Sequence, residues 1–384
     1  MTEKKKIYLD YNATTPVDQR VVDAMLPYFT EKFGNASSDH IYGWDAAEAV
    51  EIAREQIGRL ISCKSNEITF TSGATEAANL ALSGYCEGNR SKGNHIITCK
   101  TEHKAVLDTM EALETKGFEV TYLGVDANGN INLQELEEAI TSKTILVCLM
   151  LANNETGLIP PIQAIERIVN SKDVKLMSDI TQAVGKIPVD LRKLNLDLAF
   201  FSSHKIYGPK GVGALYINKQ NKVEMDPYIF GGGQEKGIRP GTLNVPGIVG
   251  FGKAADIAFS DMEMESERMV KLRNKLDDDL KHIAGAIINA GSCERLPNTT
   301  NISFKNIDGN LFLRKLNSLA ISRSSACTSN TVQPSHVLRA MGLKDDLALS
   351  SFRFSLGRNT STEDIEFAVK EITKNIGQLN RAMV

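Results

Sequence analysis

Hydrophobic residues between about residues 65 and 220 fall into short runs that are separated by longer amphipathic stretches. The runs that predict strands are ITFT, HIITCK, EVTYLGV, TILVCLM, KLMSDI, LAFFSS and GALYI. The stretches between them are long enough for helices, so strands and helices alternate along the chain. This rhythm is typical of βα units, and it predicts an α/β fold with a mainly parallel sheet between two layers of helices.

The pattern changes after residue 252. Residues 253–284 are charged and periodic and predict one long helix, and shorter strands are predicted at NTTNISF, AISRSS and SSFRFSLG. A last helix begins after Ser-Thr-Glu-Asp at residues 361–364, which resembles a capping box. Its apolar face contains Ile365, Val369, Ile372, Ile376 and Leu379. We therefore expect a large domain over residues 15–252 and a smaller α+β domain formed by residues 1–14 and 253–384.

The composition is that of an ordinary globular protein. Of the 384 residues, 42% are hydrophobic and 24% are charged, and the formal net charge is -3. Such a charge provides no general attraction for a polyanion, so we expect no direct binding of nucleic acid. No apolar segment reaches the roughly 18 residues that a membrane span needs, and the N-terminus resembles neither a signal peptide nor a transit peptide. We expect a cytoplasmic protein that has no membrane partner.

The cysteines are too scattered to predict a disulfide framework or a metal centre. They occupy positions 63, 86, 99, 148, 293 and 327, and no two of them form a C-x-x-C pair. We therefore expect no metal. Cys327 differs from the others because it lies among small polar residues, in SRSSACTSN. In a reducing compartment, most of the other cysteines should be buried.

Polar residues follow several of the predicted strands, and ligands of open α/β sheets bind beyond the carboxyl ends of the strands. After ITFT, Ser72 and Gly73 form a turn, and Ala74 and Thr75 open a helix. A helix N-terminus preceded by glycine can bind a phosphate, because its free N–H groups and its dipole favour an anion. The alternative is an ordinary turn between a strand and a helix.

Four further residues lie at or just after strand ends. His103 follows HIITCK, Asp179 ends KLMSD with Gln182 one turn later, and Lys205 follows LAFFSS. Each has a structural alternative. His103 could be a satisfied structural histidine, Asp179 a helix N-cap, and Lys205 a lysine that reaches the surface or pairs with an acid.

One cofactor explains these residues together. Pyridoxal 5′-phosphate needs a lysine for a Schiff base, a carboxylate beside the ring nitrogen and a cradle for its phosphate. Lys205 and Asp179 supply the first two, and the turn before Ala74 supplies the third. Ser202 and His204 flank Lys205 and can add hydrogen bonds to the phosphate. Burial near other cations would lower the pKa of the lysine and provide its free amine.

The order of motifs resembles that of the cysteine desulfurases, which are fold-type I pyridoxal phosphate enzymes. The resemblance extends over the whole chain, in the motifs YLDYNATTP, GNASSDH, TSGATEAANLAL, TEHKAVL, NNETG, SDITQAVGKIPVD, SSHKIYGPKGVG, GGGQEKGIRPGT, SSACTS, PSHVLRAMG and RFSLGR. It implies a large domain with a mainly parallel sheet between helices, plus a smaller α+β domain that contains the catalytic cysteine loop.

The resemblance also implies a role for each site residue. Lys205 binds the cofactor covalently, Asp179 meets the ring nitrogen, and His103 stacks on the ring and shuttles protons. Asn154 and Gln182 contact the substrate or the ring hydroxyl. The phosphate is bound by the N-terminus of the helix at Ala74 and by Thr75, Ser202 and His204. Thr242 of GGGQEKGIRPGT reaches the phosphate site of a neighbouring subunit, which implies a homodimer.

Two residues indicate the substrate. Arg353 matches the arginine that clamps the substrate carboxylate, a role for which its forked guanidinium is suited. The alternative is an ion pair at the surface or between domains. Cys327 matches the nucleophile that takes sulfur from L-cysteine, leaving L-alanine and a persulfide. The sulfur would then pass to an acceptor protein, either an iron-sulfur scaffold or a carrier for tRNA thiolation.

The cysteine loop departs from the family pattern, since Arg323 and Ser324 stand where a small residue and a glycine are usual. A nearby positive charge favours the thiolate, and the loss of a glycine stiffens the loop. Other functions remain open on the same scaffold. They are a selenocysteine lyase, a class V aminotransferase, which would not need Cys327, and a catalytically silent assembly subunit.

Overall fold

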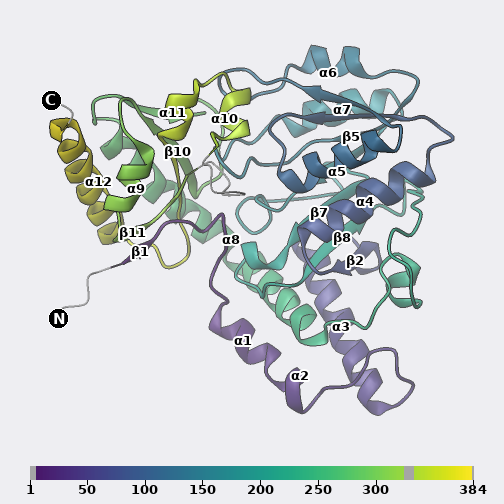
Figure 1. Ribbon diagram of the computed structural model, residues 1–384. Coiled ribbons are helices and arrows are strands. Elements are labelled where there is room, and N and C mark those ends of the chain that lie inside the picture. The colour runs from purple at the N-terminus through teal and green to yellow at the C-terminus, as the bar shows by residue number, and fades with distance from the viewer. Residues whose placement is uncertain (1–5, 324–332, 383–384) are drawn as a thin grey trace.

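The computed structural model describes residues 6–323 and 333–382 (Figure 1). Its largest sheet has seven strands in the order β2-β8-β7-β6-β5-β3-β4. The strands are β2 (Ile68–Thr71), β3 (His95–Cys99), β4 (Glu119–Leu123), β5 (Thr144–Cys148), β6 (Lys175–Asp179), β7 (Leu198–Ser202) and β8 (Gly213–Ile217). Strands β4, β3, β5, β6 and β7 are parallel to one another, whereas β8 is antiparallel to both β7 and β2. The expected mainly parallel sheet is confirmed, and all its strands coincide with the predicted apolar runs.

Helices cover both faces of this sheet. One face packs against α4 (Ala74–Gly88) and α5 (Lys104–Thr115). The other face packs against α3 (Ile41–Leu60), α6 (Leu133–Ala139), α7 (Ile162–Ser171) and the first half of α8 (Val245–Leu280). Because side chains alternate along a strand, a strand covered on both faces must be apolar throughout.

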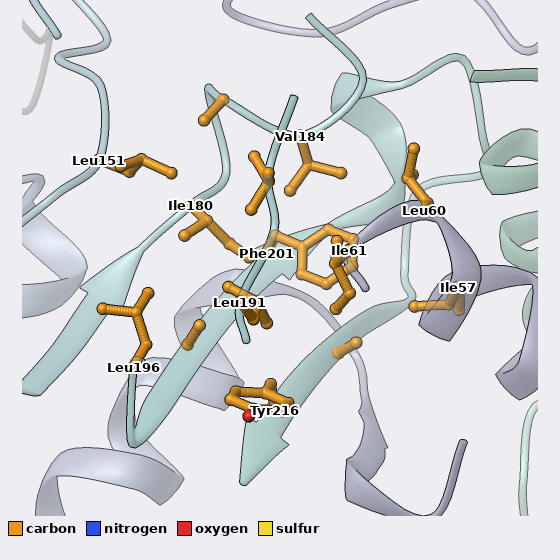
Figure 2. Packing of buried hydrophobic residues seen from close by; sticks show 14 of the residues in the cluster. Ile57, Leu60, Ile61, Leu151, Ile180, Val184, Leu191, Leu196, Phe201 and Tyr216 are labelled. Atoms are coloured by element: carbon orange, nitrogen blue, oxygen red, sulfur yellow. The ribbon is translucent and has the colours of Figure 1, made fainter. Parts of the chain in front are cut away.

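Strand β7 shows this alternation. Leu198 and Phe200 lie in the core beside α4 and α5, whereas Ala199 and Phe201 lie in the opposite core. Figure 2 shows Phe201 among Ile61, Val184 and other residues of that second core. The buried strand therefore holds the segment that follows it, which contains Lys205, at a fixed edge of the sheet.

A second, antiparallel sheet has the order β12-β13-β10-β9. Its strands are β9 (Ala286–Asn289), β10 (Thr299–Phe304), β12 (Ser322–Arg323) and β13 (Ser351–Ser355). It packs with the second half of α8, with α9 (Gly309–Lys315) and with α12 (Thr362–Ala382), which lie together on one side of the molecule (Figure 1). Two short helices, α10 (His336–Ala340) and α11 (Asp345–Leu349), precede β13.

The N-terminal segment joins this second part of the structure. Strand β1 (Ile7–Tyr8) pairs in parallel with β11 (Leu319–Ala320), and Asp10 forms an isolated bridge with Ser355. The chain then continues through α1 (Gln19–Met25) and α2 (Pro27–Thr30) to α3. The division into a domain of residues 15–252 and a domain of residues 1–14 and 253–384 stays a prediction.

Two details of the sequence prediction were wrong, and one was confirmed. The long helix begins at Val245 and ends at Leu280, rather than spanning residues 253–284, because Asn244 caps it with a bond from the N–H of Gly247. Strands β1 and β9 were not predicted. The capping box before α12 is present, since the backbone N–H of Asp364 donates to Ser361 Oγ and that of Ser361 to Asp364 Oδ2.

Three short 3₁₀ turns complete the described elements, at Ser65–Glu67, Ser203–Lys205 and Gln234–Gly237. Within residues 6–323 and 333–382, the helices are too short or too polar to cross a membrane. The Ser203–Lys205 turn follows β7 directly and is the one that bears on the candidate site.

Candidate active site

A cavity of about 570 Å³ lies beyond the carboxyl ends of the large sheet. The predicted site residues that line it are Ala74, Thr75, His103, Asn154, Asp179, Gln182, Ser202, His204, Lys205 and Arg353. The cavity is also bounded by Asn12 and Ala13 of the N-terminal segment. Thr242 is exposed and does not line this cavity, and Cys327 lies outside the described residues. The structure thus gathers the predicted residues from separate strand ends at one place.

Lys205 is the last residue of the 3₁₀ turn after β7. Its Nζ donates to the carbonyl oxygen of Asn12 at 2.5 Å and to that of Ala13 at 2.7 Å. Burial, together with the nearby Arg353, lowers the pKa of Lys205 to about 8, although Asp179 and Asp10 oppose the shift. The lysine therefore faces the cavity, and a large share of its amines is unprotonated near pH 8.

Asp179 ends β6 and is buried. Its Oδ1 accepts a hydrogen bond from the backbone N–H of Thr181 at 2.9 Å, as an N-cap would, but the residue also lines the cavity. Burial raises the pKa of Asp179, while the bond from Thr181 and the nearby His103 oppose that change. A cation placed against this carboxylate would stabilise its ionised form.

His103 caps α5 through Nδ1, which accepts from the backbone N–H of Ala105 at 3.1 Å. His103 is exposed toward the cavity, but the protein around its ring excludes part of the water, and this desolvation lowers the pKa of His103. The Asp179 carboxylate opposes part of that shift. The ring is consequently a neutral imidazole near pH 7, and Nδ1 is an acceptor. This leaves Nε2 as the N–H group. His103 is therefore both a helix cap and a cavity residue.

The turn before α4 has the backbone of an anion site. Gly73 precedes the helix with φ 158° and ψ 177°, a backbone conformation that residues other than glycine rarely adopt. A Cβ at Gly213 of the adjacent β8 would lie 2.7 Å from the Gly73 backbone, so close packing requires glycine at position 213. Ser202 and His204 line the same cavity as Ala74 and Thr75.

His204 is held in place beside that turn. Its Nδ1 lies 3.1 Å from Thr14 Oγ1. Burial, together with Lys205, Lys210 and Lys186, lowers the pKa of His204 to about 4. The nearby lysines, which add to the effect of burial on His204, would also attract a phosphate group.

Arg353 lies on β13, on the opposite wall of the cavity. Its two terminal nitrogens donate to the backbone oxygen of Asn154 at 3.0 Å and to Asp10 Oδ1 at 2.7 Å. The alternative of an ion pair is thus present, but it does not use the whole guanidinium, since each terminal nitrogen has a second N–H. These bonds hold the fork in one orientation over the cavity.

Sequence reasoning missed the residues that support these side chains. Asn12 and Ala13 accept bonds from Lys205, and Asp10 pairs with Arg353. These residues lie in the motif YLDYNATTP, but the motif does not indicate a contact between Asn12 and Lys205, which is 193 residues away. Lys186 was missed as well. It is buried, and its Nζ donates to Gln182 Oε1 at 2.7 Å.

Comparisons with known proteins agree with this geometry. The sequence pattern of the family Aminotransferase class-V matches residues 7–367. A protein of Anaeromyxobacter sp. (strain Fw109-5) named "Cysteine desulfurase IscS" is 49% identical over 378 residues, covering 98% of this chain and 94% of that protein. A protein of Shewanella loihica with the same name is 50% identical over 379 residues, with the same coverage. The chain belongs to the cysteine desulfurase family of class-V aminotransferases.

Solved structures show the same relationship. A structure described as "NIFS-LIKE PROTEIN" has a TM-score of 0.91 and 41% identity, and the match covers 97% of this chain and 100% of that one. Another, "SspA in complex with cysteine", has a TM-score of 0.81 and 37% identity, and covers 91% and 98% of the two chains. The expected fold class is confirmed.

Pyridoxal phosphate is the cofactor of this family, and the residues of the cavity fit it. A volume of roughly 300–1,000 Å³ is usual for small-molecule sites, and this cavity falls within that range. Lys205 offers an amine with a pKa near 8, and Asp179 a buried carboxylate that a cationic ring nitrogen would keep ionised. The helix N-terminus at Ala74 provides N–H groups for a phosphate. The protein is a pyridoxal phosphate enzyme.

Proposed function

We propose that this protein is a cysteine desulfurase that converts L-cysteine to L-alanine and transfers the sulfur to Cys327. The observation that supports it most directly is the set of Lys205, Asp179 and Arg353 around one cavity. An amino acid has an amine and a carboxylate. Lys205 suits exchange with the amine, and Arg353 suits binding of the carboxylate. The names of the relatives at about half identity support the same substrate.

Lys205 binds the cofactor, and its lowered pKa favours the free amine that exchange with the substrate amine requires. When bound, pyridoxal phosphate withdraws electrons from the carbon atoms of the linked amino acid. Asp179 holds a proton on the ring nitrogen, which makes this withdrawal strong. Ala74, Thr75, Ser202 and His204 hold the phosphate and so fix the ring in the cavity.

Four residues orient the reacting groups. His103 lines the cavity and would exchange a proton with the substrate, a role that suits a neutral imidazole with a lowered pKa. Gln182 and Asn154 hydrogen-bond the ring hydroxyl or the substrate. Arg353 binds the substrate carboxylate with the N–H groups that Asp10 and Asn154 leave free.

We expect the Cys327 thiolate to attack the sulfur of the bound cysteine, so that a sulfur–sulfur bond forms and the carbon–sulfur bond breaks. The electron pair of the broken bond would stay with the substrate carbon, which takes up a proton to give L-alanine, and the sulfur would remain on Cys327 as a persulfide. The described strand that leads toward it supports this assignment. In β12, Ser322 pairs with Arg353 of β13 and Arg323 pairs with Phe352. The chain therefore passes directly beside the proposed carboxylate clamp just before residue 324.

The protein acts as a homodimer in which Thr242 reaches the phosphate site of the partner. Thr242 is exposed, which suits a contact outside its own chain. Large apolar side chains that are each more than half exposed gather on α1–α3 and the loops between them, and they are Leu26, Phe29, Phe33, Ile41, Tyr42 and Trp44. An exposed apolar patch of this kind indicates a protein interface.

Three further proposals concern the setting of the enzyme. The chain divides into a cofactor-binding domain of residues 15–252 and a domain of residues 1–14 and 253–384 with the cysteine loop. The protein is cytoplasmic, which is supported by unpaired cysteines at four buried positions, 63, 86, 99 and 148. Its sulfur passes to an acceptor protein, either an iron-sulfur scaffold or a carrier for tRNA thiolation.

The test is to incubate the purified holoenzyme with L-cysteine and to measure L-alanine and sulfide, with and without a reductant. A desulfurase should form alanine in both cases, and sulfide should appear mainly when the reductant releases the persulfide. Brief exposure without reductant should add one sulfur to the peptide that contains Cys327, as seen by mass spectrometry. Amino-group transfer to a keto acid, with no sulfur on this peptide, would instead support an aminotransferase.

A further inference from the structure

Lys186 is a buried lysine that the proposed chemistry does not use. It lies in the turn after β6 and does not line the cavity. Only 8% of its surface is exposed, and no carboxylate among residues 6–323 and 333–382 forms an ion pair with it. A lysine is rarely buried without an acidic partner, so its position calls for a specific role.

The amine of Lys186 begins a chain of hydrogen bonds that ends at Lys205. Lys186 Nζ donates to Gln182 Oε1 at 2.7 Å, and Gln182 Nε2 donates to the backbone oxygen of Asn12 at 3.1 Å. That same oxygen accepts from Lys205 Nζ at 2.5 Å. Gln182 is itself buried, so water cannot easily replace either of its partners.

We propose that Lys186 is a positioning residue that fixes the Gln182 side chain, with its N–H group toward Asn12, and thereby restrains the proton affinity of Lys205. The Asn12 oxygen is an acceptor shared by two donors, so the bond from Gln182 weakens its attraction for the Lys205 proton. Without Lys186, the buried Gln182 oxygen loses its donor, and the Lys205 ammonium, which shares the Asn12 oxygen with Gln182, becomes available as a replacement. The amide would rotate toward it and stabilise the charged form.

The charges around both lysines are consistent with this role. The titratable and charged groups that interact with Lys205 are Asp10, His103, Asp179, Lys186, His204 and Arg353, and Glu76 and Lys210 also line the cavity. Burial, with Lys205 and Arg353, lowers the pKa of Lys186 well below its usual value. The hydrogen bond from Lys186 Nζ to Gln182 Oε1 is the proposed route by which Lys186 acts on Lys205, and a direct charge effect is separated from it by the double-mutant cycle below.

The test measures the proton affinity of Lys205 in the apo-protein, where no cofactor is involved. The pH dependence of brief acylation, quantified on the Lys205 peptide by mass spectrometry, should have a midpoint near pH 8 in the wild type. Lys186→Met, which keeps the length and removes the amine, should raise the midpoint by about one unit and reduce labelling at pH 7 roughly tenfold. Lys193→Met, at a lysine whose side chain is 84% exposed, should leave the midpoint unchanged.

A double-mutant cycle separates the proposed route from other effects. In a Gln182→Leu background, Lys186→Met should cause no further change in the midpoint, because the amide is gone. A full shift in that background, or an unchanged midpoint in Lys186→Met alone, would overturn the inference. If Lys186→Met does not fold, Gln182→Leu alone still decides. Its midpoint should rise, because Gln182 no longer donates to the Asn12 oxygen that accepts from Lys205. A wild-type midpoint would refute the proposal.

The inference extends to the loaded enzyme, and that extension depends on the proposed function. The pH midpoint of the bound cofactor's absorption should rise in Lys186→Met in the same direction. A shift in the apo-protein without any uptake of pyridoxal phosphate would support the role of Lys186 and contradict the cofactor assignment. Normal uptake of pyridoxal phosphate without a shift of the Lys205 midpoint in the apo-protein would support the cofactor assignment and contradict the role of Lys186.

Discussion

Replacing Arg353 by lysine tests the proposed carboxylate clamp, because the charge remains while the fork is lost. In the wild type, one terminal nitrogen donates to Asn154 O at 3.0 Å and the other to Asp10 Oδ1 at 2.7 Å. The remaining N–H of each nitrogen is available to a substrate carboxylate. The single ammonium of a lysine cannot hydrogen-bond Asp10, Asn154 and both oxygens of the substrate carboxylate in that geometry.

The expected magnitude follows from the bonds that are lost. A hydrogen bond to a charged group contributes about 1.5–3 kcal/mol, and each 1.4 kcal/mol is a factor of ten in affinity. Loss of one such bond in Arg353→Lys should raise KM for L-cysteine roughly 10- to 100-fold, with a small change in kcat, because the carboxylate is bound equally before and during the reaction. Arg353→Gln removes both bonds and the charge, so its KM should rise by roughly 10²- to 10⁴-fold.

Steady-state kinetics of alanine formation provide the assay. Arg339→Lys is a matched control, because Arg339 also pairs through a fork with an aspartate, Asp345, but at the protein surface. It should leave KM unchanged. The reasoning about the clamp is refuted if Arg353→Lys keeps the wild-type KM, or if it lowers kcat while KM stays the same. A second readout is the apo-protein, in which Arg353→Gln should raise the pKa of Lys205 and Arg353→Lys should not.

The remaining predictions concern three other residues. Asp179→Ala should still bind the cofactor but lose roughly 10²- to 10³-fold in kcat, since a fixed charge at a reacting centre typically contributes about 2.7–4 kcal/mol; near-normal turnover would contradict its role. Cys327→Ser should take up cofactor and L-cysteine, seen as a spectral change, yet release no sulfide above background, because a hydroxyl is too weak a nucleophile. The folded-state pKa of Lys205 is about 8 and its usual value is 10.5, so the unfolded chain binds more protons between these pH values. The free energy of unfolding of the apo-protein, measured in urea, should therefore rise with pH over that interval, and this rise should be smaller in Lys205→Met.

The large sheet and the rim of the site could be predicted from the sequence for a physical reason. Strands covered on both faces must be apolar throughout, so each one stands out, and the first polar residue marks its end. Parallel strands bring these ends to one edge. The sequence therefore predicts that His103, Asp179 and Lys205 lie near each other, and in the structure they line one cavity.

The start of α8 could not be predicted because its residues have low helix propensity. Residues 245–252 contain three glycines and a proline, yet they are helical and buried against α3. A Cβ at Gly252 would lie 2.5 Å from the Ala53 Cα, so close packing of the two helices requires the glycine. The tertiary contact, which is not visible in a local pattern, outweighs the propensity.

Lys186 illustrates a similar limit in the site. A lysine in a turn after a strand is normally exposed, and its neighbours in the sequence gave no sign that it is buried. Its burial arises because the turn from Thr181 to Lys186 folds under the N-terminal segment, where Gln182 meets Asn12. Contacts between residues more than 100 positions apart are set by the fold as a whole.

The N-terminal segment links the two groups that an α-amino acid requires. Asp10 holds Arg353, and the carbonyl groups of Asn12 and Ala13 hold Lys205, so a stretch of four residues fixes both the carboxylate clamp and the amine. The segment is itself fastened to the end of β13, because Ser355 accepts a bond from Asn12 N at 2.9 Å through its Oγ. Any displacement of this stretch would move the clamp and the lysine together. Their separation, on which the choice of an α-amino acid depends, is therefore restrained by this short turn, which the bond from the N–H of Ala13 to the backbone oxygen of Asp10 closes at 2.9 Å.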